Sequence, residues 1–289
     1  MTSSEGISTV GRIVFLDVDG TLVNADGNIP NSTKYAIKKA KANGHRFVIC
    51  TGRSRYQLSE ELMDMGFDGV ISSDGADVEV NGQRIHHICI DVSHRKQAED
   101  FLETTNAIYL ATTPDAIVIS ENNKQRLERY IADKGWNEDY VNQIFNAYDV
   151  NEHIWMNAEE QKFVYFESNI SIKEMNQILE PYFVVVPGSL IGTNETSGEI
   201  KISGVSKASA MEIYLKYVDI DKEKSIAIGD GANDIQMIEY AHVGVAMGNA
   251  KDIVKQHADL VTNDIDEGGI YEAFVKLGLI DEVWGTSYV

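Results

Sequence analysis

The chain has 289 residues, enough for one large domain or two modest ones, and its 43% apolar and 24% charged residues are usual for a folded globular protein. Its 25 Lys and Arg against 45 Asp and Glu give a formal net charge of -20. This balance argues against a nucleic-acid-binding protein and against docking on an anionic membrane surface, because both functions need clustered cations.

The first part of the chain alternates short apolar runs with helical patterns. Residues 13–16 form a continuous apolar run that predicts a strand buried on both faces. A helix is expected to begin near Pro30 and to end at Gly44, and a second buried strand follows at 47–50. A helix through Leu58, Leu62 and Met65 and a strand at 69–71 come next. This alternation predicts a doubly wound parallel sheet.

The pattern changes near residue 77. Asn81-Gly82 lies between two short strand-like runs and is a strong signal for a β-hairpin. The elements expected after it are a helix at 98–102, strands at 108–110 and 117–119, a helix at 127–131, a strand at 163–166, a helix at 172–179 and a strand at 183–186. This composition predicts a separate α+β unit of about 100 residues.

The first pattern returns from about Ile200. A helix at 206–217 is followed by a strand at 226–228. Two short apolar runs, at 243–246 and 259–261, come next, and a last helix covers 271–277. We therefore expect a Rossmann-like α/β core, made of residues 1–82 and 191–289, with an inserted α+β domain at 83–190.

The first predicted strand is followed directly by the run Asp17-Val18-Asp19-Gly20-Thr21. Ligands of open α/β sheets bind beyond the carboxyl ends of the strands, where these carboxylates are expected to lie. One carboxylate can attack phosphorus, and another, two residues on, can move the proton of the leaving oxygen. The alternative is a strand that ends in a plain acidic turn, since Asp and Gly favour turns.

A second acidic run, Gly229-Asp230-Gly231-Ala232-Asn233-Asp234, follows the strand at 226–228. Its alternative interpretation is that Asn233 and Asp234 only cap the next helix. Together with Asp17 and Asp19 it would place four carboxylates in one crevice, where like charges 4 Å apart repel by about 4 kcal/mol at an effective dielectric constant near 20. A divalent cation removes this repulsion, and a set of oxygen ligands without His or Cys favours Mg²⁺ over zinc.

Two further signals indicate phosphate binding. Thr51-Gly52-Arg53 follows the strand at 47–50, and a hydroxyl with free backbone N–H groups at such a turn can hold phosphate oxygens. Lys207 follows Ser206, the expected N-cap of a helix, where a cation opposes the helix dipole unless an anion is bound there. The alternatives are a plain turn and a solvated surface lysine.

These four motifs occur in the order and rough spacing of the haloacid dehalogenase-like superfamily, and the insert resembles the type IIB cap of the Cof-type phosphatases. The resemblance implies a Rossmann-like core whose cap closes over the site. It also implies that Asp17 is the nucleophile, that Asp19 is the general acid/base, and that Thr51 and Lys207 complete the catalytic set.

The same resemblance implies the ligands. Mg²⁺ would be held by the Asp17 carboxylate, the Asp19 backbone carbonyl and Asp230, with Asp234 as a further ligand or a partner of one. The phosphate would be held by the Val18 backbone, Thr51, Gly52, Lys207 and Asn233.

The sequence departs from the family pattern at one position. Similar proteins usually carry Ser-Asn-Gly-Ala after the third strand, whereas this chain has Ser73-Asp74-Gly75-Ala76. An acid thus replaces an amide close to the expected substrate mouth, which predicts a changed preference for the leaving group.

The expected function is a Mg²⁺-dependent phosphatase of a small phosphorylated metabolite, either a sugar phosphate or a phosphorylated cofactor, that acts through an aspartyl-phosphate intermediate. The alternatives are a phosphotransferase or mutase on the same fold, and a non-catalytic sugar-phosphate sensor, for which a broken motif would be expected. The two cysteines, Cys50 and Cys89, are too few for a disulfide framework, which favours a cytoplasmic protein. We expect a monomer or weak homo-oligomer that binds neither nucleic acid nor membrane.

Overall fold

The computed structural model describes residues 11–135, 148–150, 159–188 and 196–281. The chain divides into two compact units. The first unit consists of residues 1–49, 64–69 and 215–289, and the second consists of residues 50–63 and 70–214. Among the described residues, no helix is both long enough and apolar enough to span a membrane.

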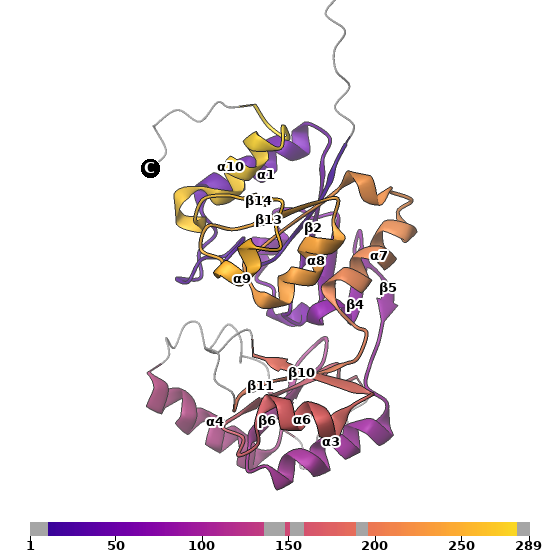
Figure 1. The fold of residues 1–289 in the computed structure, drawn as a ribbon, viewed down its shortest axis with the longest axis vertical. Coiled ribbons are helices and arrows are strands. Elements are labelled where there is room, and N and C mark those ends of the chain that lie inside the picture. Colours follow the sequence, from indigo (N-terminus) through magenta and orange to yellow (C-terminus); the bar gives the residue numbers. More distant parts are fainter. Residues whose placement is uncertain (1–10, 136–147, 151–158, 189–195, 282–289) are drawn as a thin grey trace, which may run out of the picture. The chain divides into compact units, whose positions relative to one another are not determined.

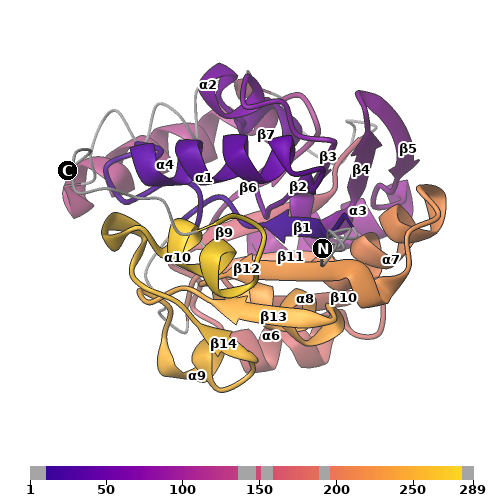
Figure 2. The same ribbon diagram turned by 90° about the horizontal axis from the view of Figure 1, so that it is seen from above.

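A sheet of eight strands runs in the order β14-β13-β12-β1-β2-β3-β4-β5, which can be followed from label to label in Figure 2. The strands are β1 (Ile13–Leu16), β2 (Arg46–Cys50), β3 (Gly69–Ser72), β4 (Asp77–Val80), β5 (Gln83–His87), β12 (Ser225–Gly229), β13 (Val243–Ala246) and β14 (Leu260–Val261). Strand β1 is parallel to both β2 and β12, β13 is parallel to its two neighbours, and β5 is antiparallel to β4. All four residues of β1 are buried, as its apolar run predicts.

Helices cover both faces of the parallel strands. The chain passes from β1 through α1 (Asn31–Ala42) to β2 on one side, and from β12 through α8 (Ile235–Tyr240) to β13 on the other. Because such crossovers are right-handed, the two helices must lie on opposite faces. Figure 1 shows α1 with α10 (Gly269–Lys276) on one side of β13, and α8 with α9 (Asp252–Lys255) on the other. The predicted doubly wound parallel sheet is therefore confirmed.

One helix of this region is shorter than predicted. The pattern through Leu58, Leu62 and Met65 predicts a continuous helix, but the structure has a 3₁₀ turn at Arg55–Gln57 and a single helical turn, α2 (Glu60–Met63). The Gln57 side chain accepts a hydrogen bond from the Ser54 backbone N–H at 2.8 Å, which closes the first turn on itself. A local side-chain bond of this kind competes with helix continuation.

The second sheet has six strands in the order β10-β11-β9-β6-β7-β8. They are β6 (Ile108–Thr112), β7 (Ile117–Ile119), β8 (Tyr148–Val150), β9 (Lys162–Phe166), β10 (Phe183–Pro187) and β11 (Gly198–Ile202). All neighbours are antiparallel except β7 and β8, which are parallel. The helices that accompany this sheet are α3 (Val92–Thr104), α4 (Glu121–Lys134) and α6 (Ile172–Leu179). This is the expected α+β cap.

Each face of the six-stranded sheet has its own apolar cluster. Tyr109 of β6 packs with residues of α3 and α6, whereas its neighbour Leu110 packs with residues of α4. Val164 of β9 belongs to the α4 cluster, so Lys162, two residues away, lies on that same face. Lys201 of β11 is the cross-strand partner of Lys162, and it therefore shares this face.

The domain limits expected at 82/83 and 190/191 stay a prediction, and the strands near them pair as follows. Strand β5 pairs with β4 in the eight-stranded sheet, and β11 belongs to the six-stranded one. The expected limit at 190/191 lies outside the described residues. Strand β11 was not predicted because Glu199 and Lys201 alternate with apolar residues, which leaves no continuous apolar run. Helix α7 (Lys207–Tyr217) then follows, close to its predicted limits.

Candidate active site

The acidic residues of the first unit follow two neighbouring strands. Leu16, the last residue of β1, pairs with Ile228 of β12, and the Asp17 backbone N–H donates to the Ile228 carbonyl at 3.0 Å. The chain therefore leaves both strands at the same edge of the sheet, Asp17 after β1 and Asp230 after β12. This is the point where the strand order reverses, which is where open α/β sheets bind ligands.

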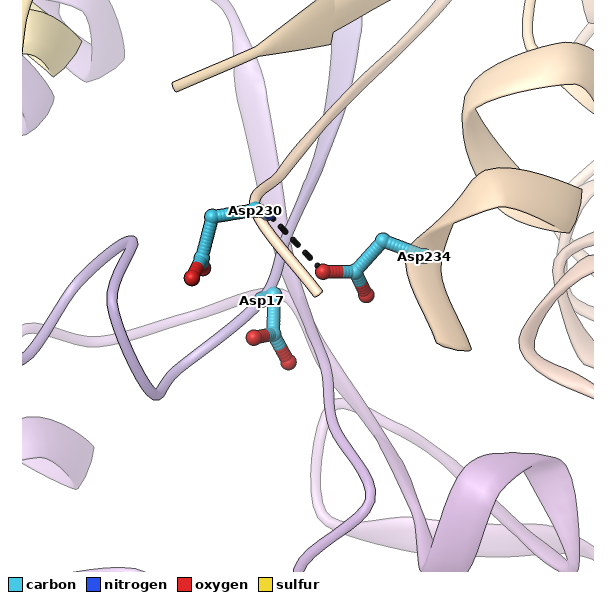
Figure 3. Close-up of side chains that lie close together, drawn as sticks. All are labelled: Asp17, Asp230 and Asp234. Atoms are coloured by element: carbon cyan, nitrogen blue, oxygen red, sulfur yellow. Dashed lines mark hydrogen bonds between the residues drawn. The ribbon is translucent and has the colours of Figure 1, made fainter. Parts of the chain in front are cut away.

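Three carboxylates gather at this edge. Asp17, Asp230 and Asp234 each offer an oxygen that lies within 4.8 Å of the others (Figure 3). The Asp17 and Asp234 side chains are buried, and Asp230 is half-buried. Three like charges at this separation repel one another, and a bound divalent cation would remove the repulsion. The predicted convergence of Asp17, Asp230 and Asp234 is thus present in the structure.

Asp234 also orders the turn that carries Asp230. Its Oδ2 accepts hydrogen bonds from the backbone N–H groups of Asp230, at 3.0 Å, and Gly231, at 2.8 Å. A Cβ atom at residue 229 would clash with the Asp234 side chain, so glycine is required there. Asp234 stands at the N-cap position of α8 but makes no side-chain cap bond to that helix, so the capping interpretation does not account for its carboxylate. The carboxylate bonds to the backbone of the preceding turn and adds its charge to the cluster.

The loop after Asp17 is tied to Asp230. Thr21 Oγ1 donates to Asp230 Oδ1 at 2.8 Å. Gly20 has φ +79°, and a Cβ atom on it would clash with the Asp230 carboxylate. Both the positive φ and the close approach require a residue without a side chain at this position. Both contacts fix the Asp230 side chain against the loop that carries the expected nucleophile.

Asn249 was missed by sequence analysis. Its Nδ2 donates to the Gly20 carbonyl at 2.8 Å, and its Oδ1 accepts from the Ile265 backbone N–H at 3.1 Å. The amide thus joins the Asp17 loop to a segment more than 200 residues away in the chain. A short polar residue in a loop carries no periodic pattern, so nothing in the sequence distinguished it.

Val18 and Asp19 shape the same loop. The Val18 carbonyl accepts from the backbone N–H groups of Leu22 and Val23, at 2.9 and 2.8 Å, and Asp19 forms an isolated β-bridge with Val23. The Asp19 side chain is half-buried and does not belong to the three-carboxylate cluster. Four carboxylates were expected in one crevice, and the structure brings three of them together. The role of the Asp19 backbone carbonyl as a metal ligand stays a prediction.

The expected phosphate-binding residues are divided between the units. Val18 and Asn233 lie in the first unit, and Thr51, Gly52 and Lys207 lie in the second. Thr51 is buried, and its Oγ1 accepts from the Arg53 backbone N–H at 3.1 Å. This bond closes the turn that follows β2.

Lys207 is buried, with 1% of its surface exposed, so the alternative of a solvated surface lysine is wrong. It is the first residue of α7, and Ser206 caps this helix, since Ser206 Oγ accepts from the Ser209 backbone N–H at 3.2 Å. The expected N-cap is therefore confirmed. A buried ammonium group at a helix N-terminus is unfavourable unless negative charge lies close to it.

Asp74 lies against the Thr51-Gly52 turn. Its backbone N–H donates to the Thr51 carbonyl at 3.0 Å, and it adopts the left-handed conformation, with φ 55°. Its Oδ2 forms ion pairs with Lys162 Nζ at 3.4 Å and with Lys201 Nζ at 3.5 Å. Lys162 Nζ also lies 3.0 Å from Glu199 Oε2. The sequence singled out Asp74, but it gave no sign of its lysine partners.

Comparison with known proteins identifies the family. Residues 14–274 match the family model of the haloacid dehalogenase-like hydrolases, and the chain belongs to this family. It is 27% identical to the putative phosphatase YkrA of Bacillus subtilis, over 93% of this chain and 98% of that protein. It is also 27% identical to the 5-amino-6-(5-phospho-D-ribitylamino)uracil phosphatase YcsE of the same organism, over 91% of this chain and 94% of that protein.

The solved structures agree. The HAD subclass IIB sugar phosphatase BT4131 superposes with a TM-score of 0.75 at 27% identity, over 93% of this chain and all of that one. The chain is thus a Cof-type phosphatase with a subclass IIB cap, as its motifs indicated. It is a phosphoric monoester hydrolase.

Proposed function

We propose that this protein is a Mg²⁺-dependent phosphatase that forms an aspartyl phosphate on Asp17. The observation that carries the proposal is the cluster of Asp17, Asp230 and Asp234, whose carboxylate oxygens lie within 4.8 Å of one another at the carboxyl ends of β1 and β12. Uncatalysed hydrolysis of phosphate monoesters is among the slowest biological reactions, so the site must supply both a nucleophile and strong charge stabilisation.

The donor set fits a magnesium ion. All three side chains offer only oxygen, the ligand atom that Mg²⁺ prefers, and the proposed fourth ligand, the Asp19 backbone carbonyl, is also an oxygen. When bound, the ion would neutralise charge on the phosphate and on Asp17, so that an anionic carboxylate can approach an anionic ester. Asp234 would serve as a ligand or would hold Asp230 through the turn described above.

The chain's own residues would carry two proton-coupled steps. In the first, an Asp17 oxygen bonds to phosphorus, the bond between phosphorus and the ester oxygen breaks, and Asp19 donates a proton to the leaving oxygen. In the second, Asp19 accepts a proton from water, the water oxygen bonds to phosphorus, and the bond to Asp17 breaks to release inorganic phosphate. This divides one difficult displacement into two easier ones.

We further propose that the phosphate group is held by the Val18 backbone, Thr51, Gly52, Lys207 and Asn233. The position of Lys207 supports its part in this set, because it lies buried at the first residue of α7, where backbone N–H groups and an ammonium group can bind the same anion. The closure of the Thr51 turn by the Arg53 N–H supports a fixed position for the Thr51 hydroxyl.

The substrate class we propose is a sugar phosphate or a phosphorylated cofactor. The support comes from the relatives, since one is named a sugar phosphatase and another acts on a phosphorylated ribitylamino uracil.

The test is release of inorganic phosphate from a panel of phosphorylated metabolites and from p-nitrophenyl phosphate, with and without Mg²⁺. Asp17→Asn removes the nucleophile with little change of shape and should lower kcat by about 10³-fold or more. Asp26→Asn is the control and should keep full activity, because Asp26 is an exposed acid in the same segment between β1 and α1. Turnover by Asp17→Asn at the parent rate would contradict the assignment.

A further inference from the structure

A buried cluster of four charged side chains lies in the second unit, outside the residues assigned above. We call it the charge cluster, and its members are Asp74, Lys162, Glu199 and Lys201. Lys162 is fixed by three partners, since its Nζ lies 3.0 Å from Glu199, 3.4 Å from Asp74 and 2.9 Å from the Gly52 carbonyl. Lys201 pairs with Asp74 at 3.5 Å.

The formal charges of the two carboxylates and the two ammonium groups sum to zero. Burial lowers the pKa of Lys162, but Glu199 and Asp74 more than offset this effect, so the pKa of Lys162 is raised overall. The side chains of Asp74 and Glu199 are 3% exposed. Each of the two lysines therefore already has a carboxylate partner within the charge cluster.

The charge cluster adjoins the turn that we propose to bind phosphate. Lys162 donates to the Gly52 carbonyl, and the Asp74 N–H donates to the Thr51 carbonyl. A Cβ atom placed on Gly52 would lie 3.2 Å from Asp74 Oδ1. An ester whose phosphate is held at Thr51 and Gly52 would therefore have its leaving group close to Asp74.

We infer that the charge cluster selects phosphate monoesters whose leaving group is uncharged, such as a sugar or a polyhydroxyl chain, against esters that carry an additional carboxylate or phosphate. Asp74 is the specificity-determining residue in this inference, which rests on the phosphate-binding role proposed for Thr51 and Gly52. A second anionic group would need a cation that is not already paired, and in the charge cluster it would meet the carboxylates of Asp74 and Glu199 instead.

The test uses pairs of esters that differ only in charge. Sorbitol 6-phosphate and 6-phosphogluconate share an open six-carbon chain, and glycerol 3-phosphate and 3-phosphoglycerate share three carbons. In each pair one hydroxymethyl group is replaced by a carboxylate. The parent protein should have the higher kcat/KM for the uncharged member of each pair. Asp74→Asn leaves the charge cluster with one net positive charge and should shift this ratio toward the carboxylate member by about tenfold, or about 1.4 kcal/mol.

Two variants separate charge from shape. Asp74→Glu keeps the negative charge and should keep the ratio of the parent. Glu199→Gln removes one negative charge at a second position and should shift the ratio in the same direction as Asp74→Asn. It also tests the inference if Asp74→Asn fails to fold, which the thermal unfolding midpoint would reveal. The shift should appear mainly in KM, because it arises from binding of the leaving group rather than from the chemistry at phosphorus.

Two results would overturn the inference: a parent protein that prefers the carboxylate members, or folded Asp74→Asn and Glu199→Gln variants with the ratio of the parent. If p-nitrophenyl phosphate is hydrolysed in an Asp17-dependent manner while the ratios stay unchanged, the inference alone fails. If no ester is hydrolysed at all, the proposed function fails, and the inference fails with it.

Discussion

The two units gather charged side chains in opposite ways. At the end of β1 and β12, three carboxylates lie within 4.8 Å of one another, so groups of a single sign are brought together. In the second unit, the charge cluster combines two carboxylates with two ammonium groups. Like charges are held together by backbone geometry and suit a mobile counter-ion, whereas opposite charges in a buried site stabilise each other. The comparison teaches that the first arrangement calls for a bound cation, whereas the second balances its own charge.

The largest effect is expected where a like-charged cluster loses a member. Asp230→Asn removes one carboxylate of the three and should raise the Mg²⁺ concentration needed for half-maximal activity by at least about 100-fold. Loss of a group that only supports a metal ligand costs up to about 100-fold in affinity, and loss of a proposed ligand should cost no less. Chelation with EDTA should abolish activity in the parent protein, and added Mg²⁺ should restore it. An unchanged Mg²⁺ requirement in Asp230→Asn would mean that the cluster is not the metal site.

The second largest effect concerns stability of the charge cluster. Lys162→Met leaves Asp74 and Glu199 buried without this partner and should lower the free energy of unfolding by about 3–5 kcal/mol, measured by urea denaturation. The matched control is Lys96→Met, because Lys96 pairs with Asp100 at 2.6 Å on the surface, where both side chains are about half exposed. Its effect should stay below about 1 kcal/mol. Equal losses in the two variants would remove the distinction drawn here.

A smaller effect is expected for Asn249. Asn249→Ala removes the amide that holds the Gly20 carbonyl, and with it part of the support that keeps Gly20 and Thr21 against Asp230. We expect about a tenfold loss in Mg²⁺ affinity. The affinity can be measured from the Mg²⁺ dependence of activity and from the shift in the unfolding midpoint when Mg²⁺ is added. Asn43→Ala is the control, since Asn43 Nδ2 also donates to a distant backbone carbonyl, that of Leu279, at 2.8 Å. A similar loss of affinity in both variants would indicate general loosening of the unit.

These comparisons also show what the sequence could predict. Asp17 and Asp230 were found because each follows a continuous apolar strand, and parallel strands bring their carboxyl ends to one edge. Lys162 and Glu199 were not found, because Lys162 precedes the apolar run of β9 and Glu199 lies in the alternating strand β11, so neither follows a buried strand. Their meeting with Asp74 depends on which strands of the cap pair and in which register. That pairing is a tertiary property, and no local pattern in the sequence encodes it.

Asn249 illustrates the same limit inside the core. Its two hydrogen bonds reach Gly20 and Ile265, and both partners are backbone groups. A backbone partner leaves no trace in the sequence, since any residue could supply it. Motifs that act through their own side chains can therefore be predicted from the sequence. The residues that hold these motifs in place mostly cannot.

The smallest effect concerns a buried acid of the cap that lies outside the charge cluster. Burial raises the pKa of Glu160 to about 8. The Arg95 guanidinium lowers this pKa by a smaller amount, and the nearby Glu99 carboxylate raises it by a still smaller one. Within the described part of the chain, neither carboxylate oxygen of Glu160 has a hydrogen-bond partner, and Arg95 Nε lies 3.8 Å away. The folded state therefore favours the protonated form more than the unfolded state does.

Protonated Glu160 therefore contributes to the free energy of unfolding in full below a pH of about 4.5, the pKa of this carboxyl in the unfolded chain. The contribution is lost as the pH rises through about 8, the pKa in the folded protein. Glu160→Gln keeps the neutral form at every pH, so its unfolding free energy should exceed that of the parent by about 1–2 kcal/mol at pH 9 and by less at pH 5, measured by urea denaturation. Glu159→Gln, at the exposed neighbour, should show no such pH dependence. A parent and a Glu160→Gln variant that differ equally at both pH values would show that Glu160 is already ionised in the folded protein.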